Sequence, residues 1–234
     1  MIDFKIITDK DKNYLCDIHA PCFQSLSAEE MELIKTSKTQ VQFRKGDNLT
    51  KQGAFASYVL YMAKGLAIQY VEGNNNKSFN LRLIKPGEFV GLSSIFSTNT
   101  FNYSSVAINN CHLVLVEKAA ILQIIGHNGI FGLGLVRRYT EQNINLFATL
   151  RTVLYKQMMG RIAEALLYIN SFKTENPEIF TLLSRKNLAD FAGITTESVV
   201  KMLKTLDKEN IVKLNGKDIE LLDLTYLEDL SKKG

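Results

Sequence analysis

The sequence predicts an α+β protein in three parts, because the pattern of apolar residues and turn residues differs between three regions of the chain. Short apolar runs separated by glycine-containing turns fill residues 41–116, and a stretch without proline or glycine follows at about 135–158. Two short amphipathic segments and a hairpin signal then occupy residues 184–222. Alternating runs between turn residues are typical of a β-barrel or sandwich, whereas a long uninterrupted stretch is typical of a helix. The expected parts are residues 1–130, 131–158 and 159–234.

Composition limits the class of protein. Of 234 residues, 46% are hydrophobic and 22% are charged, which suits one or two packed domains and excludes a disordered chain. No window approaches about 18 uninterrupted apolar residues, and the first residues lack an apolar signal core. Three cysteines at irregular spacing fit a reducing compartment. We therefore expect a soluble, cytoplasmic protein without a membrane partner.

The net charge of +4 is too small to identify a partner by itself. Within residues 184–217, however, seven Lys and Arg residues stand against four Asp and Glu residues. This local excess of positive charge is compatible with a surface that faces DNA.

The N-terminal part is predicted to begin with helix and to continue as a β-roll. Residues 1 to about 40 look helical, with Ser27 and Glu30 as a capping box ahead of an apolar stripe. Turn signals then recur every 8 to 12 residues as far as Val116, which indicates a small barrel or sandwich. A short helix is expected around Leu122 to Ile125.

The long stretch predicts a helix with an apolar seam at alternating steps of three and four. This spacing is typical of a coiled coil, and Asn143 would be the polar residue that fixes its register. The alternative is a core helix packed on its own barrel, and we favour the dimer helix. The predicted seam comprises Val136, Tyr139, Asn143, Leu146, Leu150 and Val153.

The C-terminal stretch predicts two short helices with a tight turn between them, followed by a hairpin. Ser184 and Thr195 can each cap a helix, and Gly193 supplies the turn. In the second helix Val199, Met202, Leu203 and Leu206 would face the core together. The Asn215-Gly216 pair then predicts a two-residue hairpin turn. A helix-turn-helix followed by such a hairpin is a winged DNA-binding module.

The exposed residues of this module are the predicted DNA contacts. Glu197 can accept a hydrogen bond from cytosine, Lys201 can donate to guanine, and Val200 can contact a thymine methyl group. The alternatives are that Glu197 only stabilises the positive end of its own helix and that Lys201 and Lys204 only form a solvated face. The full predicted set is Ser184, Arg185, Lys186, Thr195, Thr196, Glu197, Ser198, Val200, Lys201, Lys204, Lys213 and Lys217, with Arg185, Lys186, Lys213 and Lys217 on phosphates.

Four segments resemble the bacterial Crp/Fnr regulators, and the resemblance covers nearly the whole chain. They are Lys85–Ser93, Met159–Leu167, Leu183–Ala189 and Gly193–Lys201. The last contains a glutamate followed four residues later by a basic residue, as the recognition helix of that family does. The resemblance implies a double-stranded β-helix with the jelly-roll-like cyclic-nucleotide-binding fold, a dimerisation helix and a winged helix-turn-helix. It also implies a homodimer on a palindromic site that contacts RNA polymerase, with residues 173–178 resembling the contact loop.

Three departures from the cyclic-AMP binders of that family argue against cyclic AMP. Leu92 stands where those proteins have a glutamate that holds the ribose hydroxyl, and residues 102–105 lack the arginine that binds the phosphate. Leu146 stands at the position of the long helix that contacts the polar edge of the adenine in those proteins. A phosphate without a cation is costly to bury. A different effector is possible, and a filled, ligand-free roll is an equal alternative. The candidate effector pocket comprises Phe89, Gly91, Leu92, Ser93, Tyr103, Ser104 and Leu146.

A metal site has little support. Cys16, His19, Cys22 and Cys111 are the only weak candidates, and three cysteines cannot provide four-thiolate ligation of an iron–sulfur cluster in one chain. Haem has no support beyond the presence of His112 and His127, so the cofactor is left unknown. A redox- or metal-sensing regulator and an effector-independent regulator remain alternatives. An enzyme is not expected, because the sequence contains no His-x-His pair, catalytic triad signature or phosphate-binding glycine loop.

Overall fold

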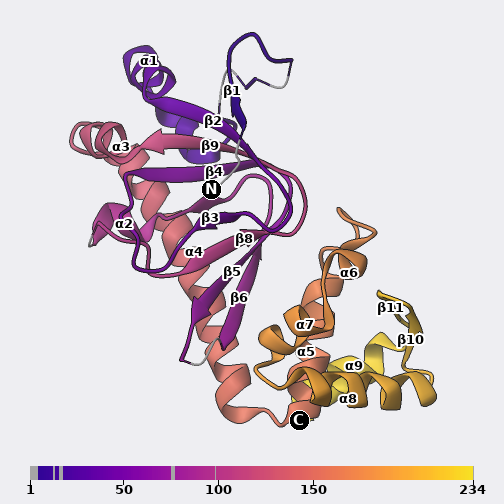
Figure 1. Cartoon of the computed structure of the whole chain (residues 1–234). Coiled ribbons are helices and arrows are strands. Elements are labelled where there is room, and N and C mark those ends of the chain that lie inside the picture. Colours follow the sequence, from indigo (N-terminus) through magenta and orange to yellow (C-terminus); the bar gives the residue numbers. More distant parts are fainter. Residues whose placement is uncertain (1–4, 13, 16–17, 75–76, 98, 234) are drawn as a thin grey trace. The chain divides into compact units, whose positions relative to one another are not determined.

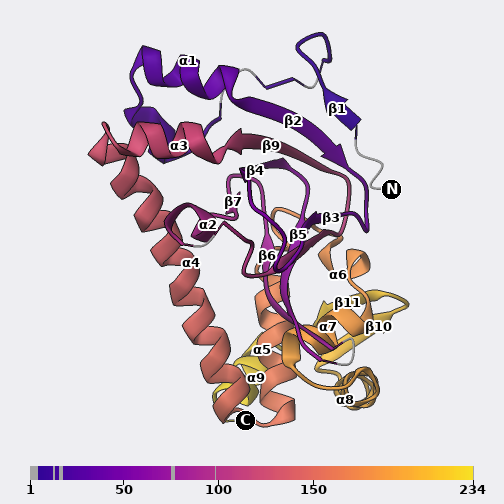
Figure 2. The ribbon, with the colours of Figure 1, turned by 60° about the vertical axis from the view of Figure 1, so that its left-hand side comes forward.

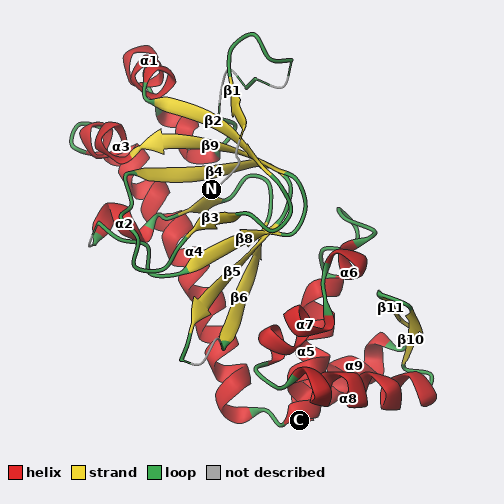
Figure 3. Cartoon of the chain, viewed as in Figure 1, coloured by secondary structure: helices red, strands yellow, loops and turns green. Residues whose placement is uncertain are grey.

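A computed structural model describes residues 5–12, 14–15, 18–74, 77–97 and 99–233 of the chain. The chain divides into two compact units, one formed by residues 1–72 and 82–144 and the other by residues 73–81 and 145–234. Strands dominate the first unit and helices the second, so the α+β class is confirmed (Figures 1 and 3).

The first unit is a roll of two antiparallel sheets. The five-stranded sheet has the order β1 (Lys5–Ile7), β2 (Lys38–Phe43), β9 (Cys111–Glu117), β4 (Tyr58–Lys64) and β7 (Phe89–Val90). The four-stranded sheet has the order β3 (Asn48–Thr50), β8 (Ser104–Ala107), β5 (Ala67–Glu72) and β6 (Ser78–Ile84). Gly65 shows why the connections need glycine, because its φ is +95° and a Cβ there would lie 2.5 Å from the Asn110 carbonyl oxygen.

Short helices accompany the sheets. They are η1 (Pro21–Ser25), α1 (Ala28–Thr36), α2 (Ser93–Phe96) and α3 (Lys118–Ile125), and α1 and α3 lie side by side near β2 and β9 (Figures 1 and 2). The predicted capping box at Ser27 and Glu30 is confirmed. The prediction that residues 1–40 are helical is wrong in part. Residues 5–7 instead satisfy their backbone hydrogen bonds by pairing with the edge of β2.

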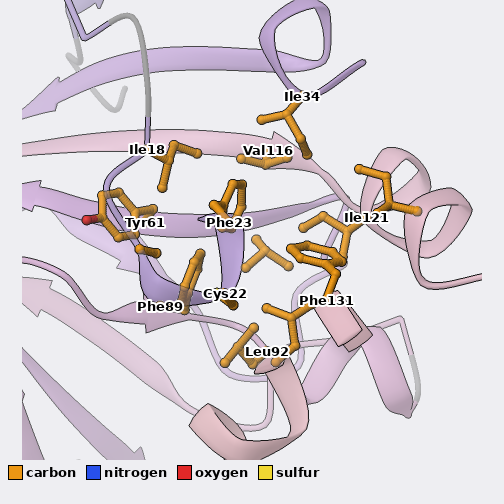
Figure 4. Packing of buried hydrophobic residues seen from close by; sticks show 14 of the residues in the cluster. Ile18, Cys22, Phe23, Ile34, Tyr61, Phe89, Leu92, Val116, Ile121 and Phe131 are labelled. Carbon is orange, nitrogen blue, oxygen red and sulfur yellow. The ribbon is translucent and has the colours of Figure 1, made fainter. Parts of the chain in front are cut away.

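An aromatic cluster fills the space between the five-stranded sheet and the helices. Phe23 stacks on Phe89 at 5.8 Å and meets Phe131 edge-on at 5.4 Å. Figure 4 shows these rings with Cys22 and Leu92 in the same cluster. This close packing anchors the start of α4 (Gly129–Tyr155), which carries Phe131.

The second unit contains α5 (Met158–Asn170), α6 (Ile179–Leu182), α7 (Arg185–Ala192), α8 (Thr196–Lys208), β10 (Val212–Asn215), β11 (Asp218–Leu221) and α9 (Leu224–Lys233). Its core includes Leu166, Leu188, Val199, Leu203 and Leu206. Among the described helices of the whole chain, none is both long enough and apolar enough to cross a membrane.

The C-terminal hairpin forms with its loop one residue later than predicted. Asn215 pairs with Asp218, so Gly216 and Lys217 are the loop residues. Gly216 has a φ of +62°, whereas Lys217 keeps a negative φ. One left-handed residue is therefore enough to close this turn.

Candidate nucleic-acid interface

The helix-turn-helix is built from local capping interactions. Ser184 caps α7 by accepting a hydrogen bond from the Asn187 backbone N–H at 3.0 Å. Gly193 ends α7 in the left-handed conformation, with a φ of +63°. Thr195 then caps α8 by accepting from the Ser198 backbone N–H at 3.2 Å. These caps fix where both helices begin, so the two predicted helix starts are confirmed.

One face of α8 is apolar and buried, and the opposite face is exposed. Val199, Leu203 and Leu206 are at most 1% exposed, and Met202 is half-buried. The exposed side consists of Thr196, Glu197, Val200, Lys201 and Lys204, which we call the reading face. No ion pair within the described part of the chain engages Glu197, Lys201 or Lys204. Their charged groups are therefore available to a partner.

Arg185 organises the wing, which is the hairpin of β10 and β11. Its guanidinium donates to the Gly216 and Lys217 carbonyl oxygens at 2.9 and 3.1 Å. The Leu214 backbone N–H also donates to Asp207 on α8 at 2.9 Å. The wing is thus attached to both helices of the motif. The sequence indicated Arg185 as a phosphate contact and gave no signal for this structural role.

The remaining predicted phosphate contacts differ in their surroundings. Lys213 and Lys217 are exposed on the wing. Lys186 forms an ion pair with Asp190 at 2.7 Å, while its side chain stays 59% exposed. The wing therefore offers two exposed lysines, and Lys186 has its charge partly balanced within α7.

The long helix α4 exposes an apolar stripe that differs in part from the predicted seam. Val136 and Leu150 are 43% and 47% exposed, as a contact with another chain requires. Tyr139 instead packs against the cluster of the roll, and its ring lies 6.3 Å from that of Phe96. Five large exposed apolar residues, in two groups separated by a step of eleven, share one face of α4, and we call them the α4 stripe: Leu133, Val136, Phe147, Leu150 and Leu154.

The other residues of the predicted seam differ in their surroundings. Val153 lies near the Gly193 turn, with its Cγ2 atom 3.8 Å from where a Cβ on that glycine would stand. Leu146 is 37% exposed and belongs to the second compact unit. Asn143 is half-buried on α4.

The predicted effector pocket is not assembled as one group. Phe89 and Leu92 are buried in the aromatic cluster, whereas Tyr103 is buried in a second cluster with Leu60 and Met62. The Gly91 backbone N–H donates to the Tyr103 hydroxyl at 2.7 Å and so joins the two regions.

The two serines of the predicted pocket lie in different settings. The Ser104 hydroxyl accepts from the Gln52 backbone N–H at 2.9 Å and is hydrogen-bonded to Glu72. The Ser93 hydroxyl is buried, and no described residue is its hydrogen-bond partner. Ser104 is therefore fully engaged by its neighbours, whereas Ser93 is not.

Arg82 on β6 is a buried cation that the sequence analysis missed. Its side chain is only 9% exposed, its Nε donates to Gln69 at 2.9 Å, and it forms an ion pair with Glu88. Its Nη2 is buried without a partner among the described residues. Burial raises the pKa of Tyr103, and the Gly91 N–H and the Arg82 charge oppose that rise.

The weak metal candidates are not brought together. Cys22 is buried in the aromatic cluster, Cys111 is buried in the second cluster, and His19 is exposed. Cys16 lies outside the described residues. Among the residues that the structure describes, no group of three or more His, Cys, Asp or Glu side chains is placed to hold a metal ion. Burial raises the pKa of Cys111 to about 12, so its thiolate is disfavoured as a ligand.

Comparisons with known proteins match both units. A model of the Crp-like helix-turn-helix domain matches residues 160–230, and a model of the cyclic nucleotide-binding domain matches residues 40–128. The cyclic AMP receptor protein of Thermus thermophilus is 23% identical over 218 residues, which is 91% of this chain and 97% of that protein.

Solved structures share the fold over most of the chain. FixK2 from Bradyrhizobium japonicum has a TM-score of 0.72 at 20% identity and covers 82% of this chain and 96% of its own. A transcriptional regulator of the CRP/FNR family from Thermus thermophilus has a TM-score of 0.68 at 20% identity, with 83% and 98% covered.

Proposed function

Because this chain belongs to the Crp/Fnr family of DNA-binding transcriptional regulators, we propose that it is a homodimer that reads a palindromic DNA site through two copies of α8. The observation that carries this proposal is the exposed, unpaired reading face on a helix whose start and opposite face are fixed. The matched families are those of regulators and not of enzymes. We place the protein in the cytoplasm as part of this proposal, since its partner is DNA.

The α4 stripe supports the homodimer. Leu133, Val136, Phe147, Leu150 and Leu154 are between 43% and 69% exposed on one helix. Large exposed apolar side chains that share one face of a helix are stabilised by burial against a second helix. A second copy of the same stripe is the partner that a two-fold symmetric DNA site calls for.

Different residues would contact the bases and the phosphates of the DNA. Glu197, Val200 and Lys201 would read base edges in the major groove, where cytosine N4, the thymine methyl group and guanine O6 and N7 are accessible. Lys213 and Lys217 on the wing, together with Lys186, would contact phosphates and set the register. Lys201 lacks the planar fork of an arginine, so its guanine contact would be a single point charge.

We further propose that the roll is not controlled by cyclic AMP. Leu92 is 0% exposed within a packed cluster, and the charge of Arg82 is already balanced by Glu88. A phosphate entering the roll would have to share that buried guanidinium with Glu88, through the Nη2 that has no partner among the described residues, and would bring a second negative charge close to that carboxylate. An effector of another chemistry and an effector-independent regulator are the alternatives. The positions of Cys22 and Cys111 in separate clusters count against redox or metal sensing. Contact of residues 173–178 with RNA polymerase is proposed from the family alone.

The test is a DNA-binding titration of the reduced, ligand-free protein against a pool of palindromic duplexes. It is run at near-physiological salt, because phosphate contacts make the affinity salt-dependent. We expect two chains per duplex and a selected site of two-fold symmetry. Binding of one chain per duplex, or equal binding of all sequences both with and without added cyclic AMP, would overturn the proposal. Selection that appears only when cyclic AMP is added would overturn the second part alone.

A further inference from the structure

The wing has an anchored base and an exposed tip. Val212 of β10 and Ile219 of β11 are each 1% exposed, so both strands are attached to the core of the second unit. Asn215, Gly216 and Lys217 at the tip are exposed. A hairpin of two short strands is marginally stable by itself, so the position of this tip depends on contacts from outside the hairpin.

One of these contacts comes from α7. Both terminal nitrogens of the Arg185 guanidinium donate to the tip, Nη2 to the Gly216 carbonyl oxygen at 2.9 Å and Nη1 to the Lys217 carbonyl oxygen at 3.1 Å. A planar guanidinium that donates to two successive carbonyls fixes both the distance and the direction of the tip from α7. Arg185 is the first residue of α7, and the Ser184 cap fixes where that helix begins.

The other contact comes from α8. The Leu214 backbone N–H donates to the Asp207 carboxylate at 2.9 Å. Asp207 lies in the last turn of α8, and Leu214 pairs with Ile219 across the hairpin. The two helices of the motif therefore hold the wing at two separate points, and all of these residues belong to one compact unit.

The charge of Arg185 is engaged inside this unit. Arg185 is half-buried, and burial lowers the pKa of its guanidinium, whereas the charge of Asp218 opposes that fall. Oδ1 of Asp218 is buried without a hydrogen-bond partner among the described residues. A phosphate that approached Arg185 would therefore also approach this carboxylate, which would repel it. Lys213 and Lys217 are exposed and are better placed to contact phosphates.

We propose that Arg185 and Asp207 are positioning residues, which hold the wing so that Lys213 and Lys217 reach the DNA backbone. Arg185 then contributes to DNA binding through the wing and not through a phosphate of its own. This inference rests on the proposed function and adds to it the residues that set the position of the wing.

The first experiment needs no DNA. Hydrogen exchange of residues 212–221 is measured by mass spectrometry in the full-length protein. Arg185→Met, which keeps an apolar stem but removes both donors, is compared with the wild type and with Lys186→Met, which removes the neighbouring cation of α7. We expect exchange in the wing to become at least about threefold faster in Arg185→Met alone, while exchange in α8 and the Tm stay near the wild-type values. Unchanged exchange in the wing would overturn the proposal.

The second experiment is a double-mutant cycle with DNA. Arg185→Met is made in the wild type and in the K213A/K217A variant, and affinity for the selected palindromic duplex is measured at several salt concentrations. We expect a loss of about fivefold in the wild type, comparable with the loss of one exposed ion pair, and of less than about 1.5-fold without the wing lysines. The slope of log affinity against log salt concentration should fall only in the first background.

Two outcomes of the cycle would contradict the proposal. An equal loss in both backgrounds would show that Arg185 contacts a phosphate directly, and no loss in either would show that the wing does not depend on it. Selective binding by the wild type and weaker binding by K213A/K217A test the proposed function itself. Failure of that function is therefore seen without any change at Arg185.

A third comparison isolates the contact from α8. Asp207→Ala and Asp207→Asn remove the same negative charge, but only asparagine keeps a side-chain oxygen that can accept from the Leu214 N–H. We expect Asp207→Ala to bind the selected duplex about threefold more weakly than Asp207→Asn. Equal affinities of the two variants would overturn the positioning role of Asp207.

Discussion

The roll and the winged helix-turn-helix use their polar side chains in opposite ways. In the roll Arg82, Gln69 and Tyr103 are buried and hydrogen-bonded to neighbouring groups, with only Nη2 of Arg82 left without a partner among the described residues. In the second unit Glu197 and Lys201 are exposed on a helix whose opposite face buries Val199, Leu203 and Leu206. Buried polar groups that satisfy one another specify a fold, whereas exposed charges held on a rigid helix are ready for a partner. The difference indicates that DNA recognition resides on α8. It also explains why the polar side chains of the roll do not identify a ligand, since they are engaged with one another.

The largest expected effect comes from the α4 stripe. Leu150→Glu places a charge in the proposed seam, so the dimer should dissociate and DNA affinity should fall by at least about 100-fold through loss of bivalency. Analytical ultracentrifugation and a binding titration measure the two effects. Asn145→Glu adds the same charge on the opposite, exposed side of α4 and should leave both unchanged. A dimeric, fully active Leu150→Glu variant would show that this stripe is not the interface.

The next effect tests whether the polar groups of the roll are structural. Arg82→Met leaves Glu88 and Gln69 without their partner, so the free energy of unfolding should fall by about 3 kcal/mol. Lys51→Met breaks the exposed ion pair with Glu72 and should cost less than about 1 kcal/mol. Urea denaturation measures both. Equal losses in the two variants would mean that the Arg82 network contributes no more than a surface pair.

A smaller effect separates phosphate contacts from base contacts. Lys217→Ala should weaken binding to all duplexes by a similar factor. It should also lower the slope of log affinity against log salt concentration by about one, because one fewer counterion is released. Lys12→Ala removes the same charge from the roll and should leave DNA binding unchanged. Titrations of specific and random duplexes at several salt concentrations give both quantities. A loss confined to one sequence would move Lys217 to the base-reading set.

The smallest effect concerns the buried thiols. Burial raises the pKa of Cys111 to about 12 and also raises the pKa of Cys22, so the reactive thiolate of each is scarce at pH 8. Alkylation of both in the folded protein at pH 8 should be more than about 100-fold slower than in the unfolded chain, and should accelerate as the pH rises. Mass spectrometry after iodoacetamide treatment measures the rates. Fast labelling of either thiol at pH 8 would contradict this and favour the redox alternative.

What the sequence predicts well is local. The caps at Ser184 and Thr195, the Gly193 turn and the buried face of α8 depend on residues within a few positions of one another, and all are confirmed. The turns of the roll are also local features, because glycines occupy turn positions that have a positive φ.

What the sequence could not predict depends on contacts between distant segments. Alternation along β6 would place Phe79 and Leu81 inside and Arg82 outside, yet Arg82 is buried and Phe79 and Leu81 are half-buried. Which face of β6 is buried depends on its pairing with β5 and on the contact of Arg82 with Glu88, and these contacts form only when the roll closes. Arg185 likewise bonds to carbonyls more than 30 residues away, so its wing contact has no local signal. Tyr139 turns toward the roll because α2 and the aromatic cluster are there to receive it.

Whether α8 reads the DNA is decided by the base-preference profiles of the wild type and of Glu197→Ala, obtained by sequencing duplexes selected from a randomised pool. We expect one position in each half-site, related by two-fold symmetry, to lose about 1–3 kcal/mol of discrimination while the other positions keep theirs. A uniform loss of affinity at all positions, or an unchanged profile, would contradict the assignment of α8 as the helix that reads the DNA.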